Sequence, residues 1–518
     1  MRRLARRGCI PRAVDPWAYP ALVSTHAPAA PVIAAASAPR WRADRTVVIL
    51  GILSAVGALV RLPFVWTGIS MDEGGYAYVA QRWAHGGDLY GSAWLDRPQG
   101  LLLVYRFLLG IDGSGWTIRA GAVLVGAGIT ALAGSIGWQL AGRRAGIAAA
   151  AVYAIAGLAP RLEGFTLNGE LLASLPAAAA VACALRWRAI RAPGWLVLAG
   201  VCAGMALTMK PSGIDGIVVA GTIVLVTERS WRAAGLLLAG FAAPLLACAV
   251  DGWARGWSRY WTAIIGYHLA AMGSQASNTS TRLSDFLSSA ERVAKDLVVP
   301  LLFAVAGLVA SWRRRATVAI MLAWLAAGVI GVNLGGSYWP HYYLQLLPPV
   351  AVLAGIAVAA VRVPWLRAVA LVAVVAPTAA WLVALVPMGQ SAREHTIPYY
   401  GLARRDERIA AEVRASTCPG DPIFVLVSEA NIYFLARRDS PYPYLWGKPI
   451  EKIPGSLERM RAVLSGPHRP VVVLLNSSPR SVDPSGQLST VLGERYRKAG
   501  SLQGMPILRS LDAPKCGN

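Results

Sequence analysis

Long apolar runs recur along this sequence and constrain its fold more than any other feature. A helix needs about 20 apolar residues to cross the hydrocarbon core of a bilayer. Hydrophobic residues make up 55% of the 518 residues and charged residues only 15%, which excludes one water-soluble globule with a polar surface. We therefore predict a polytopic α-helical membrane protein. We expect eleven crossings, near residues 46–67, 118–140, 145–160, 170–187, 194–209, 212–227, 233–250, 296–312, 316–334, 342–361 and 364–388.

The basic residues predict the orientation of these crossings. A net charge of +23 in a soluble protein would suggest nucleic acid, but here the arginines form short clusters between apolar runs. Membrane orientation explains such clusters, so we expect no nucleic-acid partner. Gln99 to Gly110 is apolar but short and contains Arg106, which favours an interfacial or re-entrant segment. If this segment does not cross, the eleven crossings place the arginine clusters on the same side of the membrane as the basic N-terminus. The N-terminus is therefore predicted inside and the C-terminus outside.

The composition divides the chain into three parts. Residues 1–45 are rich in Arg, Ala and Pro without an apolar run, which indicates a disordered cytoplasmic tail, with an organelle transit peptide as the alternative. Residues 46–389 form the transmembrane domain, with a first external loop at 68–117. Residues 390–518 alternate β-rich runs with helical stretches and predict a small extracytoplasmic α/β domain. This domain contains two cysteines, Cys418 and Cys516. An oxidising compartment would allow a disulfide between them, and the sequence does not decide whether it forms.

Polar residues gather at the predicted outer ends of the crossings. Such a set suits a reaction on a lipid phosphate, because an acceptor hydroxyl needs a base and a departing phosphate needs positive charge. Each residue also has an explanation without a functional role. The lysine could extend along its helix end to the interface, the histidine could belong to an interfacial aromatic belt, and the carboxylates could simply be solvated. The residues concerned are Asp72 and Glu73, Asp96 and Arg97, Arg161, Glu163 and Glu170, Lys210, and His341 with Tyr342 and Tyr343.

Several of these residues stand in longer motifs. The segments MDEGGYAYVAQ, GGDLY, WLDRPQG, LEGFTLNGE, LTMKPSG and HYYLQLLPP resemble the GT-C glycosyltransferases of the protein O-mannosyltransferase and aminoarabinose transferase superfamily. The resemblance covers roughly residues 46–390. It implies the GT-C fold, a polyprenyl-phosphate sugar as donor, and transfer with inversion at the anomeric carbon.

The resemblance also implies roles for individual residues. Asp72 matches the catalytic base and Glu73 its partner, while Glu170 matches the acid of the second loop. Arg97 matches a phosphate-binding lysine of the superfamily, and PQG stands where relatives have a second proline, so the phosphate contacts differ in detail. Lys210 and His341 are further phosphate-binding candidates, with Asp96, Tyr76 and Tyr342 in support. Some relatives use a divalent cation (Mg, Mn or Zn), for which Asp72, Asp96 and His341 are candidate ligands, although their spacing defines no metal site.

The expected function is an inverting, mannosyl- or arabinosyltransferase-like enzyme of the bacterial plasma membrane. It would move a sugar from polyprenyl phosphate to a protein, polysaccharide or glycolipid acceptor on the outer face. One alternative is an ion-coupled transporter, which would place ionisable residues near the bilayer midplane and show internal repeats. The other is a non-catalytic polyprenyl-phosphate-binding scaffold of the same fold.

Overall fold

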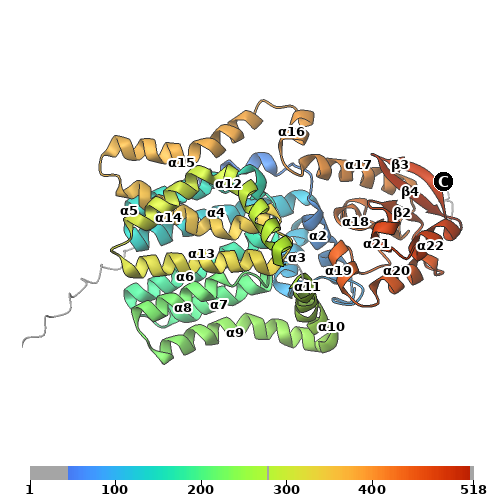
Figure 1. The fold of residues 1–518 in the computed structure, drawn as a ribbon, viewed down its shortest axis with the longest axis horizontal. Helices are drawn as coiled ribbons and strands as arrows, with labels where there is room; N and C mark the ends of the chain where they lie inside the picture. The colour runs from blue at the N-terminus through green and yellow to red at the C-terminus, as the bar shows by residue number, and fades with distance from the viewer. Residues whose placement is uncertain (1–44, 277–278, 514–518) are drawn as a thin grey trace, which may run out of the picture. The chain divides into compact units, whose positions relative to one another are not determined.

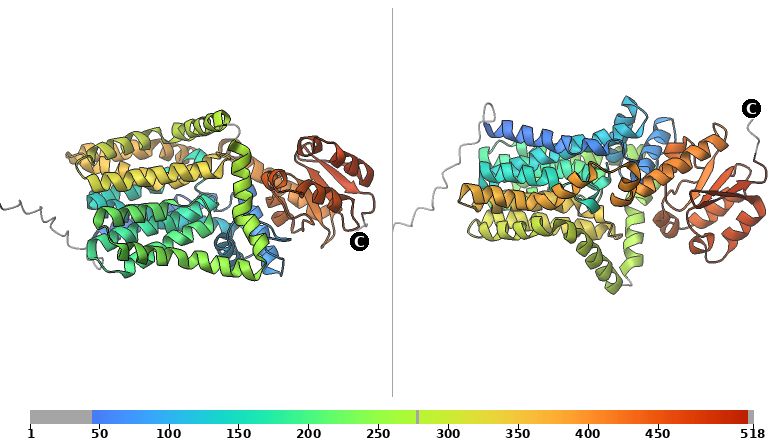
Figure 2. Two further views of the ribbon diagram at one scale, coloured as in Figure 1. Left: turned by 60° about the horizontal axis from the view of Figure 1, so that its bottom comes forward. Right: turned by 90° about the horizontal axis from the view of Figure 1, so that it is seen from above.

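The computed structural model describes residues 45–276 and 279–513. The tail predicted at residues 1–45 lies outside this part apart from Arg45, and so does Cys516, the candidate partner of Cys418. Each of the eleven predicted crossings contains a helix, and these helices run alongside one another in a bundle (Figures 1 and 2). They are α1 (Arg45–Leu59), α4 (Gly115–Ala141), α5 (Arg143–Ala156), α6 (Gly169–Ile190), α7 (Gly194–Met209), α8 (Asp215–Thr227), α9 (Trp231–Ala254), α12 (Thr279–Ala310), α13 (Arg315–Gly335), α14 (Leu347–Ala360) and α15 (Pro364–Leu385).

The helices of the bundle differ in length. Within the described residues, eight helical segments are long and apolar enough to cross a membrane. The predicted crossings at 145–160, 194–209 and 212–227 are the shorter helices α5, α7 and α8, of 14, 16 and 13 residues. Turns cut these runs: Gly157 caps α5, and the extended backbone of Lys210 ends α7 before α8 begins. The prediction of an α-helical membrane fold is confirmed.

The loop predicted to be the first external one contains two helices. The acidic pair Asp72 and Glu73 opens α2 (Met71–Ala84). The segment predicted to be interfacial or re-entrant forms α3 (Gln99–Ile111), a helix of 13 residues that follows Pro98. Arg106 on α3 lies 4.3 Å from the ring centre of Trp83, so its charge meets an aromatic face. Asp96 and Arg97 stand between these two helices, directly before α3.

The C-terminal part contains a four-stranded sheet, as the alternating composition predicts. Its strand order is β1-β2-β4-β3, with β1 parallel to β2 and the other neighbours antiparallel. All four residues of β1 are buried, as expected for an apolar strand with covered faces. The strands are β1 (Ile423–Leu426), β2 (Val472–Leu475), β3 (Tyr496–Leu502) and β4 (Met505–Ser510). The accompanying helices are α16 (Gln390–Thr396), α17 (Tyr400–Ser416), α18 (Asn431–Ala436), α19 (Gly447–Lys452), α20 (Ser456–Ser465), α21 (Pro479–Val482) and α22 (Gln487–Arg495).

Candidate active site

Glu73 is fully buried and holds three parts of the chain together. It forms a capping box with Ser70 at the start of α2, where the helix dipole favours acidic side chains. Its Oε2 lies 3.0 Å from Arg119 Nη2 on α4. Its Oε1 accepts a 2.8 Å hydrogen bond from the backbone amide of Leu167, just before α6. Both carboxylate oxygens are therefore engaged within the protein, and these contacts favour a supporting role over a direct part in chemistry.

Asp72, the neighbour of Glu73, has different surroundings. Its Oδ1 accepts a 3.1 Å hydrogen bond from the indole Nε1 of Trp446. Its side chain is partly exposed, and burial nevertheless raises the pKa of this carboxyl above its ordinary value. His341 and Arg97 oppose this rise in pKa, while Glu170 adds to it. Asp72 is thus an accessible carboxylate with increased basicity, within electrostatic reach of three other predicted site residues.

Glu170 and Lys210 form a buried ion pair. Glu170 lies in the first turn of α6, and Lys210 follows the last turn of α7. The ammonium Nζ pairs with Glu170 Oε1 and lies 3.7 Å from the ring centre of Tyr342. The two side chains of the pair are only 6% and 4% exposed. Lys210 is therefore bound inside the protein and does not extend along a helix end towards solvent.

His341 links two acidic residues. It lies in the 3₁₀ helix η4 (Pro340–Leu346), which leads into α14. Its Nδ1 is 3.2 Å from Glu163 Oε1, and its Nε2 is 3.9 Å from Glu170 Oε1. Glu163 is buried, so it is not a solvated carboxylate. Arg161, two residues earlier, pairs with Asp296 on α12.

Asp96 and Arg97 also pair with each other. Arg97 Nη1 lies 2.5 Å from Asp96 Oδ2, and Tyr90 donates a 3.2 Å hydrogen bond to the Arg97 carbonyl. Arg97 Nε is buried and has no hydrogen-bond partner among residues 45–276 and 279–513. His268, which the sequence analysis did not identify, lies 3.8 Å from Asp96 Oδ2. A partly buried guanidinium with an unused donor suits an anionic ligand.

The C-terminal part reaches this cluster through Trp446. Two further hydrogen bonds fix it to the first loop: Asn431 donates to the Ile69 carbonyl at 3.1 Å, and the Ser440 amide donates to the Tyr78 hydroxyl at 2.7 Å. The glycine pair of the MDEGGY motif permits this contact. A Cβ on Gly74 would lie 2.3 Å from the Cα of Asn431, and one on Gly75 would lie 2.4 Å from the Trp446 ring. Helix α2 therefore approaches the C-terminal part closely at two positions that lack a side chain.

The predicted supporting tyrosines lie beside these groups. The ring of Tyr76 is 5.9 Å from that of Trp446 and 5.7 Å from that of Tyr105. Burial, with Asp72 as a second cause, raises the pKa of Tyr76 well above its ordinary value, so its hydroxyl stays protonated. Tyr342 contacts both Lys210 and the ring of His341, the latter at 5.1 Å.

The candidate metal ligands do not assemble into a ligand set. Across the described part of the chain, no group of three or more His, Cys, Asp and Glu side chains is arranged to hold a metal ion. Asp96 is paired with Arg97, Asp72 accepts from Trp446, and His341 contacts Glu163. A divalent cation prefers several oxygen or nitrogen ligands converging on one point, and this arrangement does not fit one.

Comparisons with known proteins identify the fold. No protein-family model matches the sequence, and no curated protein matches it. Among solved structures, ArnT from Cupriavidus metallidurans bound to undecaprenyl phosphate superposes with a TM-score of 0.55 at 14% identity, covering 91% of this chain and 99% of that one. The apo oligosaccharyltransferase of Archaeoglobus fulgidus gives 0.54 at 14% identity, covering 92% and 76%. Both proteins are GT-C glycosyltransferases. This chain therefore has the GT-C glycosyltransferase fold, as its motifs indicate.

Proposed function

We propose that the protein is an integral membrane glycosyltransferase that uses a polyprenyl-phosphate sugar as donor. The observation that carries this proposal is the accessible carboxylate of Asp72 within electrostatic reach of Arg97, His341 and Glu170. The GT-C fold supports it, and so does the undecaprenyl phosphate bound to the ArnT neighbour. The proposed donor sugar is of the mannose or arabinose type, and the acceptor is a hydroxyl of a protein, polysaccharide or glycolipid.

In the proposed reaction Asp72 acts as general base. Its carboxylate accepts the proton of the acceptor hydroxyl as the hydroxyl oxygen attacks the anomeric carbon. The bond between that carbon and the phosphate oxygen breaks, and the lipid phosphate leaves with the electron pair. Attack from the face opposite the phosphate inverts the anomeric centre. The raised pKa of Asp72 suits this role, because a more basic carboxylate drives proton transfer better near neutral pH.

Arg97 is the proposed contact of the lipid phosphate. Its buried Nε has no partner among the described residues, and a guanidinium can bind phosphate through two parallel hydrogen bonds. Lys210 is a weaker candidate, because Glu170 already neutralises its charge. Asp96 and Glu170 then act as positioning residues that orient the two cations, and His341 adds positive charge near Asp72. No step is assigned to a metal ion.

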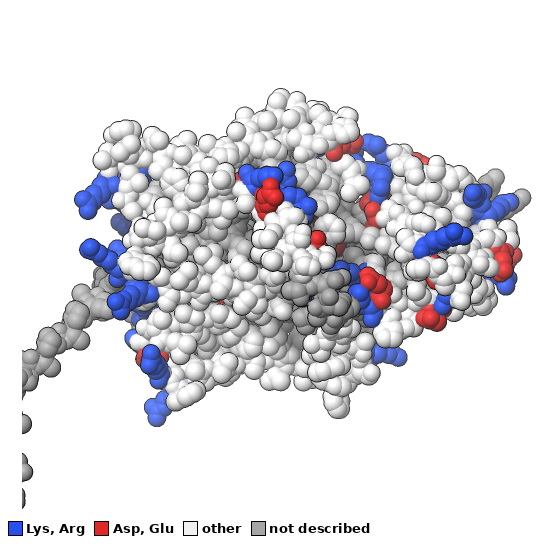
Figure 3. Space-filling model, viewed as in Figure 1, with Lys and Arg blue, Asp and Glu red and all other residues white. Residues whose placement is uncertain are grey.

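The proposed orientation places the N-terminus in the cytoplasm and the C-terminal part outside a bacterial plasma membrane. In Figure 3, lysine and arginine side chains gather at the end of the helix bundle away from the C-terminal part, beyond a broad surface without charged residues. Basic residues favour the cytoplasmic side. The site then lies at the outer end of the bundle, where a lipid-linked donor can remain in the bilayer while the acceptor arrives from water.

A transfer assay tests this function. The purified protein is incubated with polyprenyl-phosphate mannose, arabinose and other pentoses or hexoses, and a membrane extract serves as acceptor. Release of free polyprenyl phosphate and labelling of the extract are measured. One consumed donor, with the sugar recovered on an acceptor, supports the proposal. Binding of polyprenyl phosphate without consumption of any donor favours the scaffold, and absence of both binding and consumption favours the transporter.

A further inference from the structure

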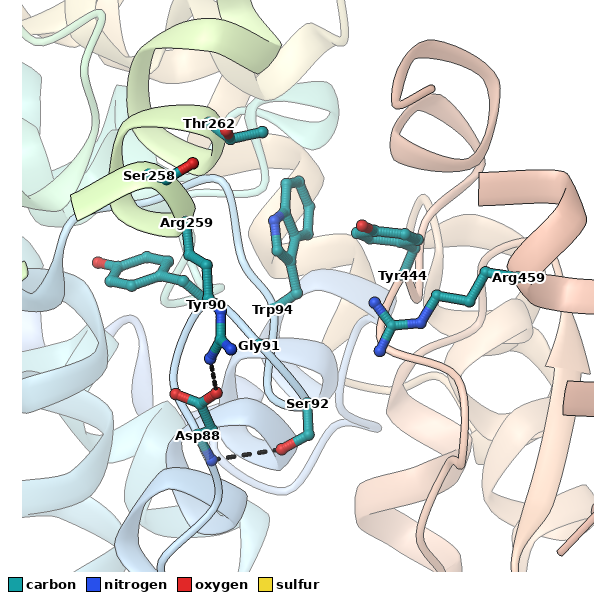
Figure 4. Close-up of a pocket in the computed structure, with 10 residues that line it drawn as sticks. All are labelled: Asp88, Tyr90, Gly91, Ser92, Trp94, Ser258, Arg259, Thr262, Tyr444 and Arg459. Carbon is teal, nitrogen blue, oxygen red and sulfur yellow. Dashed lines mark hydrogen bonds and ion pairs between the residues drawn. The ribbon is translucent and has the colours of Figure 1, made fainter. Parts of the chain in front are cut away.

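The structure contains a solvent-accessible cavity that is not part of the proposed catalytic site. It is a cavity of about 330 Å³ between the first external loop, the short helix α10 (Trp257–Trp261) and the C-terminal part. Figure 4 shows side chains from all three segments around it. Tyr90, Trp94 and Tyr444 supply aromatic rings to its wall, and Arg259 and Arg459 supply positive charge. The catalytic scheme above uses none of these five side chains.

The aromatic wall is suited to a sugar ring. Trp94 and Tyr444 pack edge to face, with their centroids 5.2 Å apart and their planes at 80°. Trp94 also packs against Tyr267 on α11 (Tyr267–Ala276) at 5.6 Å, so it is held from two sides. Binding sites for small polar molecules commonly combine such rigid aromatic surfaces with a few placed polar groups. Trp94 is only 3% exposed, so the apolar face of a pyranose or furanose ring can lie against the partly exposed Tyr444, which Trp94 holds in place.

The two arginines differ in their availability. Arg259 pairs with Asp88 at one side of the cavity. Arg459 is exposed, and its guanidinium lies 6.0 Å from the ring centre of Tyr444. No described carboxylate forms an ion pair with Arg459, and its side chain extends from α20 into the cavity (Figure 4). An unpaired guanidinium beside aromatic rings fits a carboxylate or a phosphate group.

The chain connects this cavity to Asp72 through Trp446 and to Arg97 through Asp96. Tyr444 precedes Trp446 by two residues, and Trp446 donates to Asp72. Trp94 precedes Asp96 by two residues, and Asp96 holds Arg97. A ligand in the cavity thus contacts residues that are covalently close to both the proposed base and the proposed phosphate contact.

We infer that this cavity binds an anionic sugar residue of the acceptor glycan. The partly exposed Tyr444, which the buried Trp94 holds edge to face, packs against its ring, and Arg459 pairs with its carboxylate or phosphate group. The inference rests on the proposed glycosyltransferase function, because it assigns the bound glycan as acceptor. It narrows the acceptor from any hydroxyl to one carried by an acidic saccharide.

Binding of three labelled trisaccharides to the full-length protein tests the inference. They are trigalacturonate, phosphorylated maltotriose and neutral maltotriose. The wild type is expected to bind at least one of the two anionic probes about tenfold more tightly than maltotriose, and Arg459→Ala to remove this preference. Arg497→Ala removes the same charge from an exposed residue on β3 and is expected to keep it. Equal binding of all three probes, or an unchanged preference in Arg459→Ala, would overturn the inference.

Two readouts separate this inference from the proposed function. Asp72→Asn is expected to abolish donor consumption while leaving the Arg459-dependent preference intact. Donor consumption by the wild type without any preference for anionic trisaccharides would reject the acidic acceptor alone. An Arg459-dependent preference in a protein that consumes no donor would leave an acidic-glycan site and reject the glycosyltransferase.

Discussion

The indole of Trp446 donates a 3.1 Å hydrogen bond to the carboxylate of Asp72, although 374 residues separate them in the chain. The bond joins the C-terminal part to the first turn of α2. It also affects the chemistry of the proposed base, because a hydrogen bond to the charged carboxylate favours that form and lowers its pKa. Burial acts in the opposite direction and is the larger cause, so the pKa of Asp72 remains raised.

The first prediction follows from this balance. A general base works only when deprotonated, so sugar transfer is retained above the pKa of Asp72 and lost as the pH falls through it. Trp446→Phe keeps an aromatic ring but removes the donor, and it raises the pKa further. The acidic limb of the kcat/KM profile is expected to move to higher pH. An unmoved limb, or one at lower pH, would contradict the assignment of Asp72 as base.

Gly74→Ala is expected to loosen the contact between α2 and α18. The new methyl group would lie 2.3 Å from Asn431, and overpacking of this kind costs about 1–3 kcal/mol. We expect a lower thermal midpoint and faster proteolysis within residues 390–513. Gly493→Ala is the matched control, because a Cβ there has nothing within 4 Å and alanine favours a helix. Equal midpoints for the two variants would show that α18 does not pack on α2 in this way.

Glu73→Gln separates a supporting residue from a catalytic one. The substitution leaves Arg119 buried without its charged partner, 3.0 Å away in the wild type, and a broken buried ion pair costs about 3 kcal/mol. The variant is expected to lose thermal stability and to retain activity in proportion to its folded fraction. If it unfolds at the wild-type temperature yet is inactive, Glu73 takes part in the chemistry.

Arg97→Lys is expected to weaken binding of the lipid phosphate. Lysine keeps the charge but lacks the Nε donor and the planar fork of a guanidinium. The affinity for undecaprenyl phosphate should fall about tenfold, measured by titration of the labelled lipid phosphate. Arg106→Lys, on the following helix, serves as control and should bind as the wild type does. A wild-type affinity in Arg97→Lys would move the phosphate site elsewhere, with Lys210 as the next candidate.

Glu429 should make stability depend on pH. Burial raises the pKa of its carboxyl to about 7, and Asp406 adds to this while Arg405 opposes it. Between its ordinary pKa near 4.5 and about 7, the folded state binds more protons than the unfolded state, so stability falls as the pH rises. The loss is at most about 3 kcal/mol. Glu429→Gln should reduce the pH dependence of the thermal midpoint across this range. Glu458→Gln changes a side chain that is 69% exposed and should leave that pH dependence unchanged.

The sequence predicts the helices of the bundle and most members of the polar cluster. Apolar length and arginine position predict the crossings and their orientation. The predicted orientation puts five site residues on the same side of the membrane without knowledge of any contact: Asp72, Arg97, Glu170, Lys210 and His341. The ends of the crossings are less predictable, because an apolar run does not show where a turn such as Gly157 or Lys210 interrupts it.

Two features of the site could not be predicted from the sequence. Asp72 and Glu73 are adjacent acidic residues, and the sequence does not distinguish their roles. Only the packed structure shows that Glu73 pairs with Arg119 while Asp72 accepts a hydrogen bond from Trp446. His268 and Trp446 stand in segments without a motif, and long-range packing brings them to Asp96 and Asp72. The glycine pair at Gly74 and Gly75 was the available signal, since bare helix faces accommodate a close neighbour, but it does not identify that neighbour.

The most direct test of the central claim is the single-turnover rate of sugar transfer by Asp72→Asn. The variant is loaded with the polyprenyl-phosphate sugar that the wild type consumes, and its thermal midpoint is measured first to establish that it folds. Loss of a general base lowers such a rate by about 10²–10⁴-fold, and we predict a decrease of that size with donor binding unchanged. A folded Asp72→Asn that transfers sugar at the wild-type rate would contradict it.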